Sequence, residues 1–143
     1  MKVYKANRKG FFKNLILAVG LLLVTIIILD SATFLQSSWL LLPLLAPLGL
    51  LLWIYVDTYY QLEQTKLKYK SGFLKGEIDV LQIKEIVKGK TLWAGLKPAL
   101  ASKGLTIKYN RFDEIYIAPE NNTDLLRDLL AINSHIVVKE EGK

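Results

Sequence analysis

The sequence contains no cysteine and a single histidine, His135. A disulfide framework and thiol chemistry are therefore excluded, and the lack of cysteine suits a reducing compartment. A structural zinc site needs several Cys or His ligands and is excluded as well. No glycine-rich phosphate loop precedes a helical pattern. We therefore predict neither an enzyme nor a bound cofactor.

Acidic residues are almost absent from the first part of the chain. Asp30 is the only one before residue 57, whereas five basic residues precede the first apolar run: Lys2, Lys5, Arg8, Lys9 and Lys13. The net charge of +6 is thus concentrated near the N-terminus. A basic cluster beside an apolar run favours an anionic membrane surface, and not nucleic acid, as its partner.

Two long runs contain no charged residue. Residues 15–29 read LILAVGLLLVTIIIL, and residues 39–56 read WLLLPLLAPLGLLLWIYV. A bilayer core of ~30 Å needs about 20 mainly apolar helical residues. The first run approaches that length when it begins at Phe11, with Lys13 reaching toward the headgroups. We predict a transmembrane helical hairpin over residues 15–56, with spans at about 11–29 and 39–56.

The basic residues next to these spans indicate the topology. They precede the first span and recur at residues 66–70, whereas the connecting segment 30–38 has none. By the positive-inside rule, both termini are expected in the cytoplasm and the hairpin in the cell (inner) membrane. The alternative is a signal peptide, since a basic segment followed by an apolar run also fits one. The second run follows almost at once and would still need a membrane, which favours the hairpin.

The spans have the composition of an anchor. Pro47 should kink the second span, and a neighbouring helix would have to cover the break. Ion and proton pathways usually need ionisable groups inside the membrane, and only the peripheral Lys13 is present. Five aromatic residues resemble the belt found at membrane interfaces: Trp39, Trp53, Tyr55, Tyr59 and Tyr60.

Residues 57–143 have the pattern of one small α+β domain. Apolar residues alternate with polar ones in several short stretches, which predicts half-buried strands. Ser71-Gly72 and Asn110-Arg111 are expected to form turns. After Pro119 the period changes to 3.6, with Asn121 or Asn122 as the cap and Asn133 as the stop. The apolar face of this helix consists of Leu125, Leu126, Leu129, Leu130 and Ile132. We predict six or seven antiparallel strands, as a small barrel or sandwich, capped by one C-terminal helix.

Several stretches in chain order resemble one known family. They are TYY at residues 58–60, LKYKSG at 67–72, IDVLQIKEI at 78–86, PALAS at 98–102, LTIKYN at 105–110 and FDEIYIAPE at 112–120. Together they resemble the bacterial YyaB-like PH (pleckstrin-homology) domain, found in membrane proteins, over about residues 58–136. The resemblance implies a PH-like fold and brings no established activity with it. The domain organisation we expect is a basic cytoplasmic segment (1–14), the hairpin (15–56) and a cytoplasmic PH-like domain (57–143).

Two polar groupings could carry chemistry but have simpler explanations. His135 could act as a general acid or base, although an exposed loop histidine is favoured without a partnered nucleophile. Asp113 and Glu114 beside Arg111 could bind a cation, but a charged hairpin tip is simpler because calcium sites gather more oxygen ligands.

The best candidate contact residues are Lys66, Lys68, Lys70 and Trp93. Alternation places the three lysines on one strand face, where they could meet anionic headgroups. An ordinary solvated strand face is the alternative, and we prefer it because alternating lysines are common on exposed strands. Trp93, in a long loop, could touch a partner or the membrane, or could cover one end of the barrel.

Two functions remain after these exclusions. The first is a membrane-tethered module whose PH-like domain binds a protein or a lipid headgroup. The second is a structural accessory subunit whose hairpin packs against a larger membrane complex. The sequence leaves the oligomeric state open.

Overall fold

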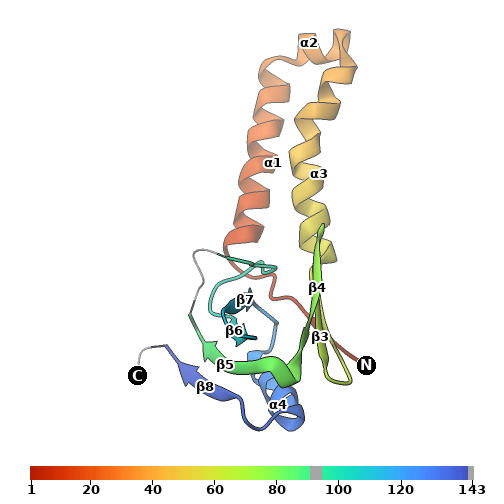
Figure 1. The fold of residues 1–143 in the computed structure, drawn as a ribbon. Coiled ribbons are helices and arrows are strands. Elements are labelled where there is room, and N and C mark those ends of the chain that lie inside the picture. Colours follow the sequence, from red (N-terminus) through yellow and green to blue (C-terminus); the bar gives the residue numbers. More distant parts are fainter. Residues whose placement is uncertain (91–94, 142–143) are drawn as a thin grey trace.

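The computed structural model describes residues 1–90 and 95–141. Two long helices rise from one end of a domain made of two sheets and a third helix (Figure 1). The helical elements are α1 (Phe11–Leu29), α2 (Ser31–Gln36), η1 (Ser38–Leu40), α3 (Leu41–Asp57), η2 (Val80–Gln82) and α4 (Asn122–Ile132). The strands are β1 (Lys2–Lys5), β2 (Tyr59–Glu63), β3 (Lys66–Ser71), β4 (Leu74–Asp79), β5 (Ile83–Lys88), β6 (Leu105–Tyr109), β7 (Asp113–Ile117) and β8 (Val137–Glu140).

The two apolar runs form the two long helices, α1 and α3, which we call the helix pair. Their bounds agree with the expected spans within two residues at each end. Their connection is mostly helical, through α2 and η1, where the sequence indicated only a loop. Pro47 lies inside α3, which continues through it to Asp57.

The first sheet contains β1, β2, β3 and β4 in that order, all antiparallel. β1 and β2 are neighbours in the sheet, with Lys5 opposite Tyr59, although the whole helix pair lies between them in sequence. The helix pair is therefore an insertion between two adjacent strands. Since β1 precedes α1, the expected separate N-terminal segment (1–14) is wrong: its first residues belong to the domain.

The second sheet has the order β7-β6-β5-β8, and β8 runs parallel to β5. The described residues thus form eight strands in two four-stranded sheets. We expected six or seven antiparallel strands, all before the helix. The sequence pattern missed β1 and β8, and β8 follows α4. The β6–β7 turn also has three residues, 110–112, where we expected a two-residue turn.

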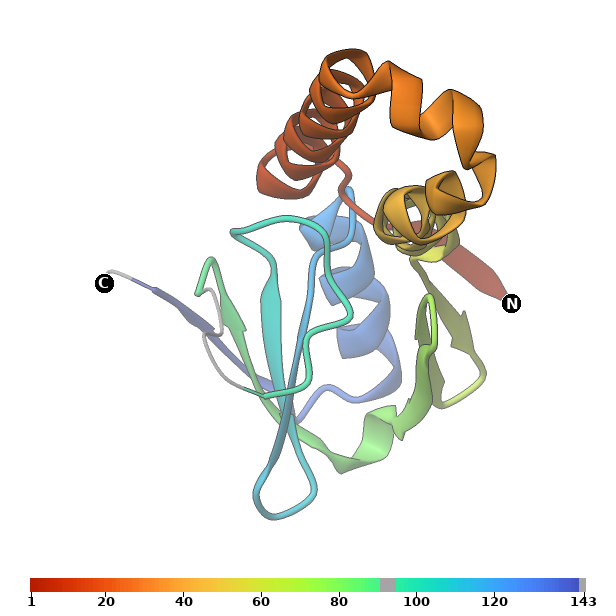
Figure 2. The same cartoon turned by 90° about the horizontal axis from the view of Figure 1, so that it is seen from above.

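Helix α4 closes the domain at the end away from the helix pair and lies between the two sheets when seen from above (Figures 1 and 2). Asn121 caps it by accepting hydrogen bonds from the N–H groups of Thr123 and Asp124. Leu125 and Leu129 are fully buried in the core that both sheets share. Asn133 ends the helix and donates to the carbonyls of Val80 and Ile83, which ties α4 to the junction between the sheets.

Strand β1 is joined to α4 as well as to β2. Tyr4 and Ala6 are buried in the core, and Tyr4 and Lys2 both donate hydrogen bonds to the Asp128 carboxylate. These bonds, from Lys2 first and then Tyr4, lower the pKa of Asp128 from 3.8 to about 2. Burial, together with the bond to Asp128, raises the pKa of Tyr4.

This contact predicts a loss of stability in acid. The pKa of Asp128 is lower in the folded state than in the unfolded chain. Its contribution to the free energy of unfolding is therefore complete above pH ~4 and disappears as the pH falls toward 2. We expect the melting temperature of the full chain in detergent micelles to fall over this range. In Asp128→Asn the fall should be smaller, because no carboxylate remains to protonate. Equal falls in both proteins would contradict the role of Asp128.

Tyr60 corrects one further expectation. It was assigned to an aromatic belt, but its side chain is fully buried in the domain core. Its hydroxyl donates to the Pro98 carbonyl at 2.6 Å and accepts from the Ala118 N–H at 3.0 Å. Tyr60 therefore connects the first sheet to the 95–104 segment and to the end of β7.

Candidate functional site

The helix pair leaves its apolar surface uncovered. Both helices are long and apolar enough to cross a membrane, and Leu23 is the only residue of α1 or α3 that is buried. Trp39, at the far end, is 67 % exposed. Soluble proteins rarely expose contiguous apolar surfaces of this size. The two helices therefore suggest association with a membrane.

The base of the helix pair is packed against the domain. Phe12 and Tyr55 stack with their ring centroids 6.4 Å apart, and both contact the domain core together with Ile54. Arg8 lies over the Tyr55 ring and donates to the Val56 carbonyl at 2.9 Å. These contacts fix the direction in which the domain faces relative to the helices.

The three candidate lysines lie on one face of β3, as alternation predicted, but each forms an ion pair. Lys66 pairs with Glu77 at 2.5 Å, Lys68 with Glu63 at 2.6 Å, and Lys70 with Asp57 at 2.9 Å. The hydrogen bond with Lys68 holds the pKa of Glu63 below its ordinary value, and the bond with Asp57 raises the pKa of Lys70. Their positive charge is thus largely offset within the domain.

Several exposed basic residues form no ion pair with a described carboxylate, Lys84 and Lys103 of the domain among them. Those at the start of the helix pair and on the first sheet are Lys5, Arg8, Lys9, Lys13 and Lys75. Arg8, Lys9 and Lys13 were expected here because they precede the first span. Lys75 was missed by sequence reasoning, because only the register of β4 against β3 brings it beside Lys70.

The outer face of the first sheet has a shallow pocket of about 440 Å³, which Lys70 and Lys75 help to line. Lys70 and Lys75 are directly opposite each other in the register, with Tyr59 next to Lys70. Gln61, Lys68 and Glu77 form the next row away from the helices. The acidic partners Glu63 and Glu77 belong to these further rows, and Lys70 is paired with Asp57 at the end of α3. Lys75 therefore supplies the unpaired positive charge at the end of the pocket toward the helix pair.

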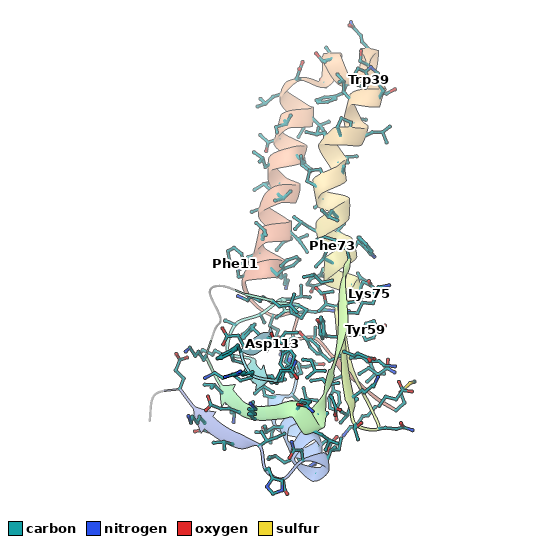
Figure 3. All side chains as sticks on the ribbon, viewed as in Figure 1. Phe11, Trp39, Tyr59, Phe73, Lys75 and Asp113 are labelled. Atoms are coloured by element: carbon teal, nitrogen blue, oxygen red, sulfur yellow. The ribbon has the colours of Figure 1, made fainter. Side chains whose placement is uncertain are left out.

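The β3–β4 turn adds an exposed aromatic residue beside this pocket. Phe73 is 67 % exposed and, in Figure 3, lies next to α3 at about the level of Phe11. Sequence reasoning identified the Ser71-Gly72 turn but assigned no role to Phe73. An aromatic residue at the tip of a tight turn was the signal, because turn residues are usually small or polar.

In the described part of the chain, the remaining candidate residues do not form a catalytic or metal-binding site. His135 is exposed, as are Arg111, Asp113 and Glu114 at the β6–β7 turn. No group of three or more His, Cys, Asp or Glu residues that could hold a metal occurs among the described residues. Trp93 lies outside the described residues.

Two four-stranded sheets, antiparallel except for the β5–β8 pair, with a helix at one end, define the class of small PH-like domains. The pattern of one family, the Bacterial PH domain, matches residues 58–133, and the chain belongs to that family. Domains of this family are typically binding modules and not enzymes.

One relative extends the likeness beyond the domain. The chain is 29 % identical over 109 residues, 75 % of each chain, to "Uncharacterized protein YyaB" of Bacillus subtilis (strain 168). That alignment is longer than the stretch from Thr58 to the C-terminus, so it includes part of the apolar helices. No solved structure matches the chain.

Proposed function

We propose that this protein is a membrane-anchored binding module. The helix pair crosses the cytoplasmic membrane twice, and the PH domain lies against its inner face with both termini in the cytoplasm. The bare apolar surface of α1 and α3 carries this proposal, because in water it would cost roughly 25 cal/mol for each Å² of apolar surface left exposed.

The pairing of β1 with β2 supports an even number of crossings. These strands precede and follow the helix pair, and they can pair only on the same side of a membrane. If only one of the two helices crossed the membrane, β1 and β2 would lie on opposite sides of it and could not pair. A cleaved signal peptide is disfavoured too, because cleavage after α1 would remove Tyr4 and Ala6 from the core. The basic residues at the base of the pair favour the cytoplasmic side.

A lipid surface is the binding partner that the charges favour. The unpaired residues Arg8, Lys9 and Lys13 lie at the start of α1, where an anionic inner leaflet would meet them. Lys66, Lys68 and Lys70 are already paired with carboxylates, so they add less to such a contact than their sequence positions implied. A protein partner remains the alternative occupant of the exposed sheet face.

The topology can be tested with single cysteines, since the natural chain has none. We expect Ser38→Cys, between the helices, to react with an impermeant thiol reagent in intact cells. Ser102→Cys, exposed on the domain, should react only after the membrane is permeabilised. Reaction of Ser102→Cys but not Ser38→Cys in intact cells would reverse the proposed orientation. Reaction of both would mean that the helix pair does not cross the membrane.

A second function is favoured by Pro47. This residue has no N–H, so the Pro43 carbonyl one turn earlier lacks its usual helical donor. In a membrane such a group needs cover from a neighbouring helix. The helix pair would then pack on a larger membrane protein, as an accessory subunit. A pull-down from detergent extracts distinguishes the two functions: partners that persist when the helix pair is replaced by a linker bind the domain, and partners that disappear bind the helices.

A further inference from the structure

The β3–β4 turn is attached to the last turn of α3. The Thr58 hydroxyl donates to the Ile54 carbonyl at 2.6 Å and shares a hydrogen bond with Ser71 at 2.8 Å. Gly72 lies so close to Ile54 that an added Cβ would come within 2.8 Å of the Ile54 side chain. Gly72 also has a φ of +57°, which a residue with a side chain rarely adopts. The turn therefore has a fixed position on the helix.

This attachment sets the depth of the turn. Ile54 lies three residues before Asp57, the end of α3, which corresponds to about 4.5 Å along the helix axis. If α3 spans the membrane, the turn reaches into the headgroup region rather than remaining below it. Phe73, next to Gly72, is exposed there and points away from the core.

Cationic groups lie immediately below the turn. In Figure 3, Phe73, Lys75 and Tyr59 follow one another down the same side of the domain. Lys75 has no ion-pair partner among the described carboxylates, and Lys70, which is paired with Asp57, lies opposite it in the register. Together with Tyr59 they form the part of the pocket that is closest to the helix pair. An anionic group descending from the membrane would reach Lys75, which has no acidic partner, before the lysines of the rows further from the helices.

We propose that Phe73 inserts into the inner leaflet and that Lys75, in the pocket beside Lys70, binds the phosphate of an anionic phospholipid from the same membrane. This inference rests on the proposed function, because it requires that α3 crosses the bilayer. The lipid contact proposed here differs from one made by the whole lysine face of β3. Lys66, at the far end of β3 and paired with Glu77, takes no part in it.

The depth of Phe73 is tested in the full chain, reconstituted in nanodiscs. An environment-sensitive dye is attached to Phe73→Cys and, as the matched control, to Phe112→Cys. Phe112 is also an exposed phenylalanine at a hairpin tip, but its neighbour Asp113 lies further from the helix pair in Figure 3. Lipids with a spin label near the headgroup should quench the dye at position 73 and leave the dye at position 112 bright. Equal quenching at both positions, or none at position 73, would overturn the insertion of Phe73.

The phosphate pocket is tested in the same nanodiscs by raising the fraction of phosphatidylglycerol in phosphatidylcholine. The reporter is a dye on Val3→Cys, an exposed position beside the pocket and opposite Gln61 in the register. Lys75→Gln should raise the phosphatidylglycerol fraction needed for half the signal about fivefold, which corresponds to ~1 kcal/mol. Lys66→Gln should change it less than twofold. Equal effects of the two substitutions would overturn the assignment to Lys75.

Two further outcomes separate this inference from the proposed function. Inorganic phosphate added to pure phosphatidylcholine nanodiscs should leave the signal unchanged, and a full response to it would overturn the lipid as the source of the phosphate. A dye at position 73 that remains in water, in a chain whose cysteine labelling fits two crossings, would refute the inference and leave the proposed function standing. Labelling that contradicts two crossings would refute both.

Discussion

A chain that begins at Thr58 should precipitate or melt without cooperativity, whereas a chain that keeps residues 1–7 should fold without its helix pair. In the second chain, residues 8–57 are replaced by about eight Gly and Ser residues, whose mean reach is ~15 Å. This linker has to join strands that already lie side by side, because Lys5 is opposite Tyr59. The comparison therefore isolates the contribution of β1.

The expected difference is large because β1 completes the core. Tyr4 is 7 % and Ala6 3 % exposed, and burying an aromatic side chain of this size contributes about 1.5–3 kcal/mol. The contact of Lys2 and Tyr4 with Asp128 is lost too. These losses are a substantial share of the 5–15 kcal/mol that stabilises a small domain. Without β1, the backbone of β2 also becomes an open edge, which promotes aggregation.

Circular-dichroism melts and size-exclusion chromatography of the two soluble chains provide the measurement. The linked chain should elute as a folded species and melt cooperatively, though below the full chain, since it lacks the contacts of Phe12 and Tyr55. A chain from Thr58 that melts at the same temperature as the linked chain would show that β1 is dispensable.

The parts of the fold that depend on local pattern could be predicted from the sequence. Continuous apolar runs gave both long helices, and the Asn121 cap and the Asn133 stop gave the bounds of α4. The Ser71-Gly72 turn and the strands around it follow from alternation and turn chemistry. Each of these features is determined by residues within a few positions of one another.

The features that sequence reasoning missed depend on pairing between distant segments. β1 is only four residues long, and its partner β2 begins more than fifty positions later. β8 has four exposed residues and no buried alternation, so its pairing with β5 leaves no sequence pattern. Tyr60 follows directly on an apolar run, so a membrane-belt assignment fitted the sequence as well as a core position did.

The candidate contact residues show the same limit. Alternation placed Lys66, Lys68 and Lys70 on one face, which the register of β3 confirms. Their acidic partners come from β2, β4 and the end of α3, and only the register brings those carboxylates within reach. The sequence could therefore locate the basic strand but could not show that its three lysines are paired while Lys75, on the neighbouring strand, is not.

Leu129→Asp should unfold the domain. Leu129 is fully buried where α4 meets the core of both sheets, and no basic residue lies in the last turn of the helix to pair with a new carboxylate. Removing a leucine side chain from a core costs about 2–5 kcal/mol before any charge is considered. Burying an unpaired charge adds several kcal/mol, so the total approaches the whole stability of a small domain.

Ala131→Asp is the matched control for this substitution. It adds the same side chain to the same helix, but position 131 is exposed. An acidic residue near a helix C-terminus costs about 0.3–1 kcal/mol through the helix dipole, and both variants share this cost. Limited proteolysis and melts of the full chain in detergent micelles should therefore find Leu129→Asp cleaved within the domain and Ala131→Asp close to the natural protein. Similar behaviour of the two variants would mean that the buried face of α4 does not hold the two sheets together.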